Sequence, residues 1–311
     1  MKRYSQTVAE HYGEKFIETG YRPLREFEVV IKGKKVRKPL IQFTLEKLFE
    51  IDSIGDITIV GHQMLIQQYL NKFIRQQKKP CRIVNQNSKI LPDLIETFSI
   101  KPRKVKFNSI GGNLIKGYAA GRAFKDQKHA LIVASDSPLT RKAFIEDFLN
   151  HAQKCEDHAS IIVPVISIGN PTDKLGRKPL KLINDSDYQL ESARDRHNRQ
   201  GFRLSSLMYV NPFSFDINTI NTAYNLRKWM NPNVQMRLFK ITRSHGYPNV
   251  YSKYFLKKSL SINEIENIGT AFFKGRLKII PTRGDESTYD YDGTESEYYS
   301  IAKMLSSGTY Q

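Results

Sequence analysis

The sequence predicts an α/β fold in which helices cover both faces of a twisted, mostly parallel sheet. Two observations support this class: short apolar runs typical of buried strands recur along the chain, and segments with helical spacing of apolar residues separate them. With 311 residues and 40% hydrophobic content, the chain is long enough to bury one large core. One large α/β domain and two small ones both fit this length. We expect residues 1–311 to form a single domain in which right-handed crossovers join the parallel strands.

The amino-terminal half contains two strand-and-helix units. Residues 1–27 show no clear periodicity, and Phe27–Lys38 reads as a hairpin around the glycine turn Lys32–Lys35. Apolar residues then follow helical spacing from Leu40 to Phe49. The second unit consists of a strand at Asp56–Val60, a helix at Leu65–Arg75 and a strand at Cys81–Val84.

The run Ala130–Ala134 is the central strand of the predicted sheet. Five apolar residues are too few for a helix and suit a strand that is buried on both faces. Asp136 follows at the carboxyl end of this strand, where open α/β sheets bind ligands, and Thr140–Leu149 reads as the next helix. Asp136 is therefore a candidate ligand for a divalent cation. The alternative is that Ser135, Asp136 or Ser137 caps the next helix, with Pro138 in its first turn.

A glycine-rich segment precedes the central strand. Gly111, Gly112 and Asn113 begin a stretch whose helical pattern continues to Phe124. Glycines here would let the backbone approach a ligand, with N–H groups at the helix start facing an anion. An ordinary turn explains the same residues equally well.

The carboxyl-terminal half continues the alternation around a basic, helical insertion at residues 212–258. The basic segment Lys174–Lys181 lies ahead of this insertion and is either a solvated loop or the rim of a phosphate site. Ser261 is a plausible cap for the helix Glu264–Phe273. The other expected elements are strands at Ala159–Ile168, within Gly201–Val210 and at Leu277–Ile280, and helices at Asn218–Met230, Val234–Arg243 and Glu295–Leu305.

Acidic residues crowd together after the last predicted strand, although the chain as a whole is basic. The six carboxylates are Asp285, Glu286, Asp290, Asp292, Glu295 and Glu297. Acids at the start of the last helix would be stabilised by its dipole. The functional alternative is a second metal ligand that the sheet brings beside Asp136.

The formal net charge of +18 indicates an anionic partner, and nucleic acid, an acidic membrane surface and phosphorylated metabolites all fit it. Arg227, Lys228, Arg237, Lys240 and Arg243 lie among aromatic residues, a mixture that can bind single-stranded nucleic acid. Helical spacing also makes most of these rings core residues. Two cysteines form neither a disulfide framework nor a metal-thiolate pattern, and no apolar run is long enough to span a bilayer. We therefore expect a cytoplasmic protein.

Several stretches together resemble the MobA-like nucleotidyltransferases, a family with the GT-A-type fold of nucleotide-diphospho-sugar transferases, a three-layer α/β sandwich. Ala130–Thr140 is similar to the family signature of an uncharged strand followed by Asp-x-Pro-Leu, and Tyr289–Tyr298 to its late Asp-x-Asp-Thr-Pro-Glu-Asp stretch. Lys38–Leu48 followed by Asp56–Gly61 looks like the family's Lys-Pro-Leu, helix, strand opening, and Leu260–Glu266 resembles the helix before the final strand.

The resemblance implies that a phosphorylated small-molecule acceptor attacks the α-phosphorus of a nucleoside triphosphate and that pyrophosphate leaves. Mg²⁺, or Mn²⁺, would be held by Asp136 and Asp292, with Asp290 as the alternative second ligand. Arg22 and Lys38 would act as catalytic phosphate-binding cations. Gly111, Gly112 and Asn113 would lie near the nucleotide, and the strand that carries Arg203 and Ser205 would face the acceptor.

The chain departs from the family pattern at two places. Relatives begin with an apolar strand and a glycine-rich loop that cradles the triphosphate, whereas Thr7–Lys15 has a single glycine. Asp292-Gly-Thr also places a glycine where the family has Asp-Thr-Pro. These departures favour a relative that binds a nucleotide or nucleotide-sugar without turnover. A glycosyltransferase on the same fold and a nucleic-acid-binding protein are two further hypotheses, and the oligomeric state is left open.

Overall fold

A computed structural model describes residues 21–167, 182–183, 202–226, 232–253, 260–283 and 290–308. Several features named above lie outside these ranges: the stretch Thr7–Lys15, the basic segment Lys174–Lys181, and Arg227, Lys228, Asp285 and Glu286.

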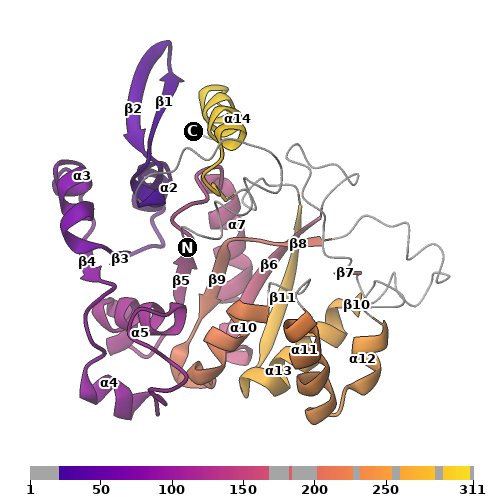
Figure 1. Ribbon diagram of the computed structural model, residues 1–311. Coiled ribbons are helices and arrows are strands. Elements are labelled where there is room, and N and C mark those ends of the chain that lie inside the picture. Colours follow the sequence, from indigo (N-terminus) through magenta and orange to yellow (C-terminus); the bar gives the residue numbers. More distant parts are fainter. Residues whose placement is uncertain are drawn as a thin grey trace.

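The main sheet has the strand order β11-β6-β9-β5 (Figure 1). Its strands are β5 (Ala130–Val133), β6 (Ile161–Ser167), β9 (Leu207–Val210) and β11 (Leu277–Arg283), and β8 (Phe202–Leu204) pairs with the end of β6. β6 and β11 are parallel, but β9 is antiparallel to both of its neighbours. The α/β class is confirmed, and the sheet is mixed because β9 runs antiparallel to both β5 and β6.

Three further strand pairs surround this sheet in the described residues. β3 (Ile57–Gly61) and β4 (Cys81–Asn85) are parallel, as are β7 (Leu182–Ile183) and β10 (Leu260–Ser261). β1 (Glu26–Ile31) and β2 (Lys34–Pro39) form the predicted antiparallel hairpin. Its turn residues Lys32 and Gly33 have φ angles of 49° and 76°, the positive values that two-residue hairpin turns require.

Helices pack on both faces of the sheet and complete a three-layer sandwich. One face carries α2 (Leu40–Glu50), α3 (Gln63–Arg75) and α7 (Lys142–Gln153), whose apolar residues share a core with Ile162 and Ile166 of β6. The alternate β6 residues Ile161 and Val165 belong to the second core, on the opposite face. The helices that contribute to this second core include α4 (Pro92–Thr97), α5 (Ile110–Ala120), α10 (Ile220–Leu226) and α13 (Ile262–Phe273).

The remaining described helices are short or peripheral. They are α6 (Arg122–Lys125), α11 (Pro232–Ser244), α12 (Pro248–Ser252) and the 3₁₀ turns Arg22–Leu24, Glu156–His158, Pro212–Ser214 and Ile217–Thr219. α10, α11 and α12 occupy the segment that was predicted as a helical insertion. Among the described residues, no helix combines the length and the low charge needed to cross a bilayer.

Strand β5 is less buried than its sequence predicts. All four of its residues are half-buried, whereas we expected burial on both faces. The reason is its position, since β9 is the one described strand that pairs with it and its other edge has no described strand partner.

The start of α7 decides between the two interpretations of the Asp136 loop. This helix begins at Lys142, and its N-cap Arg141 makes no side-chain capping bond. The prediction that Ser135, Asp136 or Ser137 caps it is therefore wrong. The physical reason is that residues 137–140 form a separate turn, in which the Ser137 carbonyl accepts hydrogen bonds from Thr140 and Thr44. The predicted cap of α13 is confirmed, because Ser261 and Glu264 form a complete capping box.

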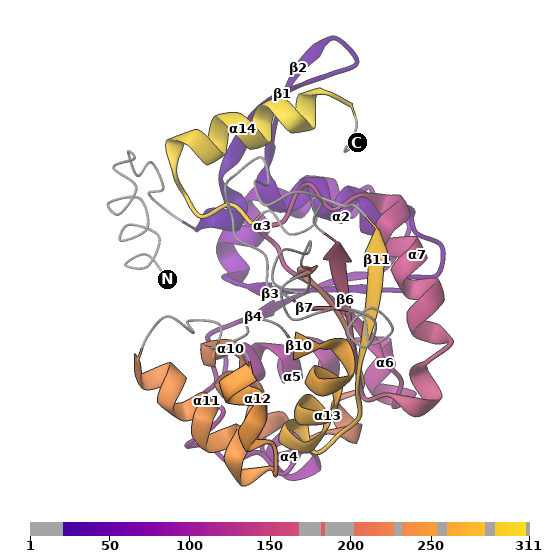
Figure 2. The same cartoon turned by 90° about the vertical axis from the view of Figure 1, so that its right-hand side faces the viewer.

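A third, smaller core joins the hairpin to α14 (Glu295–Ser306). Phe27 and Val29 of β1 pack against Ile301 and Leu305 of α14, and Tyr291 is completely buried among them. Figure 2 shows α14 lying across the base of the hairpin. This packing places the residues just before α14 beside the carboxyl end of β5.

Candidate functional site

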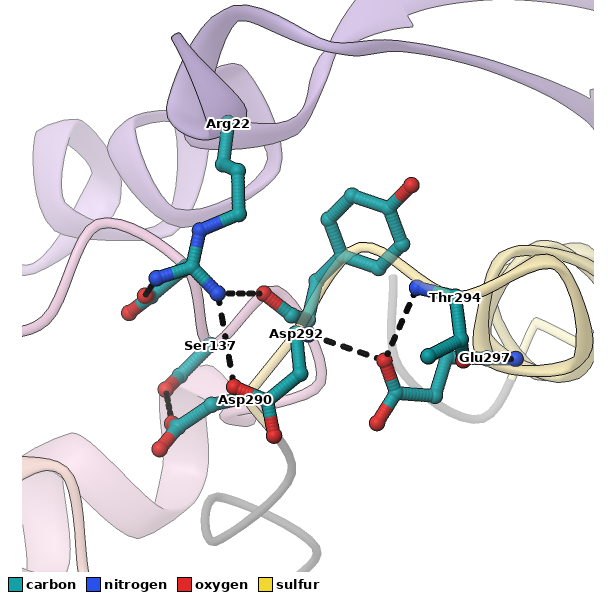
Figure 3. Close-up of polar contacts among 8 residues, drawn as sticks. Arg22, Ser137, Asp290, Asp292, Thr294 and Glu297 are labelled. Atoms are coloured by element: carbon teal, nitrogen blue, oxygen red, sulfur yellow. Dashed lines mark hydrogen bonds and ion pairs between the residues drawn. The ribbon is translucent and has the colours of Figure 1, made fainter. Parts of the chain in front are cut away.

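Three segments that are far apart in the sequence meet at the carboxyl end of β5. They are the 3₁₀ turn Arg22–Leu24, the loop after β5 and the segment 290–294 that leads into α14. The Tyr291 N–H donates to the Asp136 carbonyl at 2.9 Å and joins the last two segments directly. Figure 3 shows the result, with Arg22 and Ser137 facing Asp290 and Asp292.

Arg22 lies between the two carboxylates that the resemblance marks as metal ligands. Its Nη1 is 3.3 Å from Asp292 Oδ1, and its Nη2 is 3.9 Å from Asp136 Oδ2. Nη1 also donates to the Tyr291 carbonyl at 3.0 Å. The Arg22 side chain is only 13% exposed, so the two ion pairs are partly shielded from water. The carboxylates of Asp136 and Asp292 therefore both face the positively charged guanidinium of Arg22.

Asp290 belongs to the same cluster. The Ser137 hydroxyl donates to Asp290 Oδ1, and Ser137 is completely buried. Ser137 therefore fixes Asp290 against the loop that carries Asp136, and Asp290 adds a third carboxylate to the site.

The electrostatics of Asp136 reflect this crowding of acids. The pKa of Asp136 is raised to about 6, because burial raises it most and the charges of Asp290 and Asp292 raise it as well, while Arg22 lowers it. A carboxyl with this balance gains from any additional cation nearby, because the charged form is the disfavoured one.

Two side chains of α2 form hydrogen bonds with the loop that carries Asp136. Lys47 is 6% exposed, and its Nζ donates to the Pro138 carbonyl at 2.8 Å. Thr44 is also buried, and its hydroxyl donates to the Ser137 carbonyl at 3.4 Å. The loop after β5 is therefore attached to a rigid helix on one side and to Tyr291 on the other.

Asp292 is positioned by the start of α14. Glu297 Oε2 accepts from the Asp292 N–H at 2.9 Å and from the Thr294 N–H at 3.4 Å, while the Thr294 hydroxyl accepts from the Glu297 N–H (Figure 3). Gly293 has a φ of 101°, a conformation that favours glycine and turns the chain between Asp292 and the cap. The glycine that departs from the family pattern is thus required by this turn.

Tyr21 extends the site toward β3. A Cβ added to Gly61, at the end of β3, would lie 2.6 Å from the Tyr21 hydroxyl, so the tyrosine packs directly on this glycine. Burial raises the pKa of Tyr21, a hydrogen bond from the His62 backbone lowers it, and the Asp136 charge raises it. The Tyr21 ring therefore joins the ends of β3 and β5.

The donor set can be compared with what a divalent cation needs. Within the described ranges, no group of three or more His, Cys, Asp or Glu side chains is arranged to hold a metal ion. Mg²⁺, however, is usually held by one or two carboxylates and completes its shell with water and substrate phosphates. Asp136 and Asp292, which already share one cationic group, fit this two-carboxylate arrangement and do not form a closed protein cage.

The glycines Gly111 and Gly112 lie in the first turn of α5, not in a loop. Asn221 Oδ1 accepts the Gly111 N–H at 2.9 Å, and the Ser109 hydroxyl accepts the Gly112 N–H at 3.2 Å. A Cβ on Gly112 would lie 2.7 Å from the Phe107 carbonyl oxygen and closer still to that of Lys106. Contacts within the chain therefore already account for both glycines and for both N–H groups.

The side-chain oxygen of Asn113 is a buried hydrogen-bond acceptor near the carboxyl end of β3. A Cβ on Gly117 would meet Val60, and one on Gly121 would approach Thr58, so α5 runs antiparallel to β3. Asn113 precedes Gly117 by one helical turn, so it lies toward His62, the residue that follows β3. Asn113 Oδ1 and His62 Nδ1 are both buried without a hydrogen-bond partner among the described residues. Asn113 thus lies at the edge of the sheet where ligands bind.

Three further predicted site residues, Lys38, Arg203 and Ser205, belong to β2, to β8 and to the turn after β8. Lys38 pairs with Glu46 of α2 at 2.8 Å and lies over the Phe43 ring. Arg203 is on β8 opposite Ile166, and its side chain is outside the described set. Ser205 is not on a strand but in the turn between β8 and β9, where its N–H donates to the Pro164 carbonyl at 3.2 Å.

Sequence reasoning missed three residues that shape the site, Tyr21, Thr44 and Lys47, and it named Ser137 only as a possible helix cap. A lysine or threonine on the buried side of a predicted amphipathic helix is a signal that could have indicated Lys47 and Thr44. No sequence signal identifies Tyr21, because its role depends on the glycine at the end of another strand.

No family model and no curated protein matches the chain. Among solved structures, it is similar to CMP:2-keto-3-deoxy-manno-octonic acid synthetase complexed with CTP, with a TM-score of 0.52, 9% identity and 95% of each chain covered. It is also similar to a hypothetical transferase from Thermus thermophilus, with a TM-score of 0.46, 14% identity and 94% of each chain covered. The first likeness shows that the two chains share a fold, and the second is too weak to carry an argument.

Proposed function

We propose that the protein is a nucleotidyltransferase of the MobA-like type that transfers a nucleoside monophosphate from a nucleoside triphosphate to a phosphorylated small molecule and releases pyrophosphate. The observation that carries the proposal is the meeting of Asp136, Asp290, Asp292 and Arg22 at one edge of the sheet. The sequence motifs that carry the family resemblance contribute three of these residues. The carboxyl edge of the strands is where α/β folds generally bind ligands, which supports the proposal.

Asp136 and Asp292 would hold Mg²⁺ or Mn²⁺ together with the phosphates of the nucleotide, and Asp290 would support them. When bound, the cation neutralises the charge that develops on the phosphates during transfer. Because the protein supplies two carboxylates and not a cage, we expect the metal to bind well only together with the nucleotide.

Arg22 is the residue that can contact both the acids and the phosphates. Its two terminal nitrogens face Asp136 and Asp292, and a guanidinium also binds phosphate oxygens through paired hydrogen bonds. Arg22 would orient the triphosphate and shield it from the repulsion of the acids. Asn113 Oδ1 and His62 Nδ1, which have no described partner, are the polar atoms placed to contact the remainder of the nucleotide.

Thermal unfolding with each nucleoside triphosphate, with and without Mg²⁺, tests the nucleotide and the metal together. We expect one nucleotide to raise the Tm in a metal-dependent way, since a ligand bound only by the folded state stabilises it. Asp136→Asn and Asp292→Asn should abolish the metal-dependent part. Asp147→Asn, which removes an exposed carboxylate of α7, is the matched control and should retain it.

Pyrophosphate release with a panel of phosphorylated sugars and alcohols separates turnover from binding. Release that depends on one acceptor supports the transferase. A Tm shift without release with any acceptor would indicate a binding protein, and a larger shift with a nucleotide-sugar would indicate a glycosyltransferase. Retention of the metal-dependent shift in Asp136→Asn would refute the assignment of the metal ligands.

A further inference from the structure

Two long segments of the chain contain many cations and no acid. Residues 97–125 contain seven Lys and Arg residues and no Asp or Glu, and residues 217–263 contain eight and again no acid. These fifteen charges compare with a net charge of +18 for all 311 residues. Residues 57–92 also lack Asp and Glu and contain six Lys and Arg residues, so sequence alone does not single out one basic surface.

The segments 97–125 and 217–263 lie against each other in the structure. α10 packs between α5 and α11, as Figure 1 also shows. Asn221 of α10 donates to the Lys104 carbonyl at 2.7 Å and to the Ser109 hydroxyl at 3.0 Å. Arg237 of α11 donates to Thr222 of α10 at 3.0 Å. These bonds fix the loop 101–107 and the helix α11 on the two sides of α10.

The loop 101–107 and helix α11 together present seven exposed cations. We call these seven residues the basic face. They are Lys101, Arg103, Lys104 and Lys106 in the loop and Arg237, Lys240 and Arg243 on α11. None of them forms an ion pair with a carboxylate of the described residues, whereas exposed Lys35 and Arg37 of the hairpin pair with Glu28 and Glu26. In both views the helices α10–α12 lie at the end of the molecule opposite α14 and the hairpin (Figures 1 and 2). The basic face is thus separate from the acidic site.

The side chains among these cations resemble those of a nucleic-acid contact more than those of a membrane contact. Asn108 and Asn225 are exposed, and Thr222 is half-exposed, so uncharged donors for phosphate and sugar oxygens accompany the positive charges. Phe107 is 44% exposed next to Lys106, where an unstacked base can lie on its ring. Of the α11 residues with described exposure, Met236 is the only apolar one that is exposed. A helix that lies in a membrane surface presents a continuous apolar side, which these residues do not form.

We propose that the basic face binds single-stranded nucleic acid, with the seven cations contacting phosphates and Phe107 stacking on a base. This binding function is independent of nucleotidyl transfer, because it uses neither the acidic cluster nor a nucleoside triphosphate. The partner is recognised by its backbone charge and by its unpaired bases, so we expect little sequence preference.

The test measures the fluorescence anisotropy of a labelled oligothymidylate of about 20 nucleotides at several salt concentrations. The affinity of the wild-type protein should fall steeply with salt, with a slope of about −0.7 for each phosphate neutralised on a single strand. In the basic-face variant, Arg103, Lys106, Lys240 and Arg243 are each changed to Gln. This variant should bind at least about tenfold more weakly, and its slope should be smaller by about 3.

The matched control changes Lys34, Lys72, Lys78 and Lys154 to Gln, four exposed lysines elsewhere on the surface. It removes the same charge and should bind nearly as well as the wild type. Equal weakening of the two variants would overturn the proposal, because the net charge alone would then explain binding. All eight side chains are exposed, so both variants should fold, and circular dichroism checks this.

Two further arms distinguish the kinds of partner. Phe107→Ser should weaken binding to the oligothymidylate, and a duplex of equal length should compete less well than the single strand. Equal competition by the duplex would overturn the single-strand assignment. Binding to vesicles that contain phosphatidylserine, without binding to the oligothymidylate, would overturn the nucleic-acid assignment in favour of a membrane surface.

Discussion

Asp136→Asn should stabilise the metal-free protein near neutral pH, although it removes a residue of the candidate active site. Burial and the Asp290 charge raise the pKa of Asp136 from 3.8 to about 6, even though Arg22 lowers it. The folded protein therefore binds this proton more tightly than the unfolded chain does. The stability linked to the protonated form is complete below the unfolded pKa and is lost as the pH rises through the folded pKa.

The magnitude follows from the difference between the two pKa values. A shift of about two units corresponds to about 3 kcal/mol that the wild type loses between low and neutral pH. Asn cannot ionise, so the variant avoids this loss. At about pH 5 the variant should be more stable than the wild type by about 1–2 kcal/mol, and at about pH 8 by up to about 3 kcal/mol, with solvent screening reducing both values.

Thermal or urea unfolding in EDTA at several pH values measures this difference. The Asp147→Asn variant controls for the loss of a carboxylate outside the site. If the advantage of Asp136→Asn does not grow with pH, or if the variant is less stable than the wild type at about pH 8, the reasoning about acid crowding is wrong.

Three further perturbations test the structure around the site. Gly112→Ala should lower the free energy of unfolding by about 1–3 kcal/mol without any ligand, because its Cβ would meet backbone oxygens of residues 106 and 107. Gly111→Ala should be nearly neutral, because its Cβ meets the side chains of Asn221 and Val105. Equal Tm values for the two variants would refute the steric explanation. Lys47→Met keeps the apolar length of the side chain but removes the hydrogen bond to the Pro138 carbonyl. It should lower the free energy of unfolding by about 1–3 kcal/mol and weaken the nucleotide-dependent Tm shift. A normal shift would show that the loop after β5 does not need this hydrogen bond. Ser261→Ala should cost about 1 kcal/mol in urea unfolding by removing the cap of α13, with Ser261→Thr as the conservative control; an unchanged midpoint would contradict the capping role.

Much of the fold could be predicted from the sequence because local patterns determine it. Helical spacing located α2 and α3, and the Ser261 and Glu264 pair located the start of α13. The antiparallel direction of β9 could not be predicted, because an apolar run has the same composition in either direction. The half-buried β5 depends on which strands lie beside it, and a single run of residues contains no information about that.

The candidate site shows the same division. Asp136, Asp290 and Asp292 were identified from motifs and Arg22 from its position in the family resemblance, and the structure brings them together. Lys38 belonged to an equally plausible motif, yet it pairs with Glu46 on α2. Gly111 and Gly112 begin a helical stretch, as expected. The sequence could not show that the carbonyl groups of residues 106 and 107 leave no room for a Cβ on Gly112, because that contact depends on how the chain folds back.

The contact between Arg22 and Asp292 has a consequence for how the candidate site forms during folding. These residues are 270 positions apart, so the ion pair closes a very long loop. Contacts of such sequence separation form late, after the shorter-range units have folded. A partly folded molecule can therefore have the sheet with helices on both faces and still lack the contact between Arg22 and Asp292. We expect activity to be regained after dilution from denaturant more slowly than helical structure, with the docking of α14 on the hairpin as the final step.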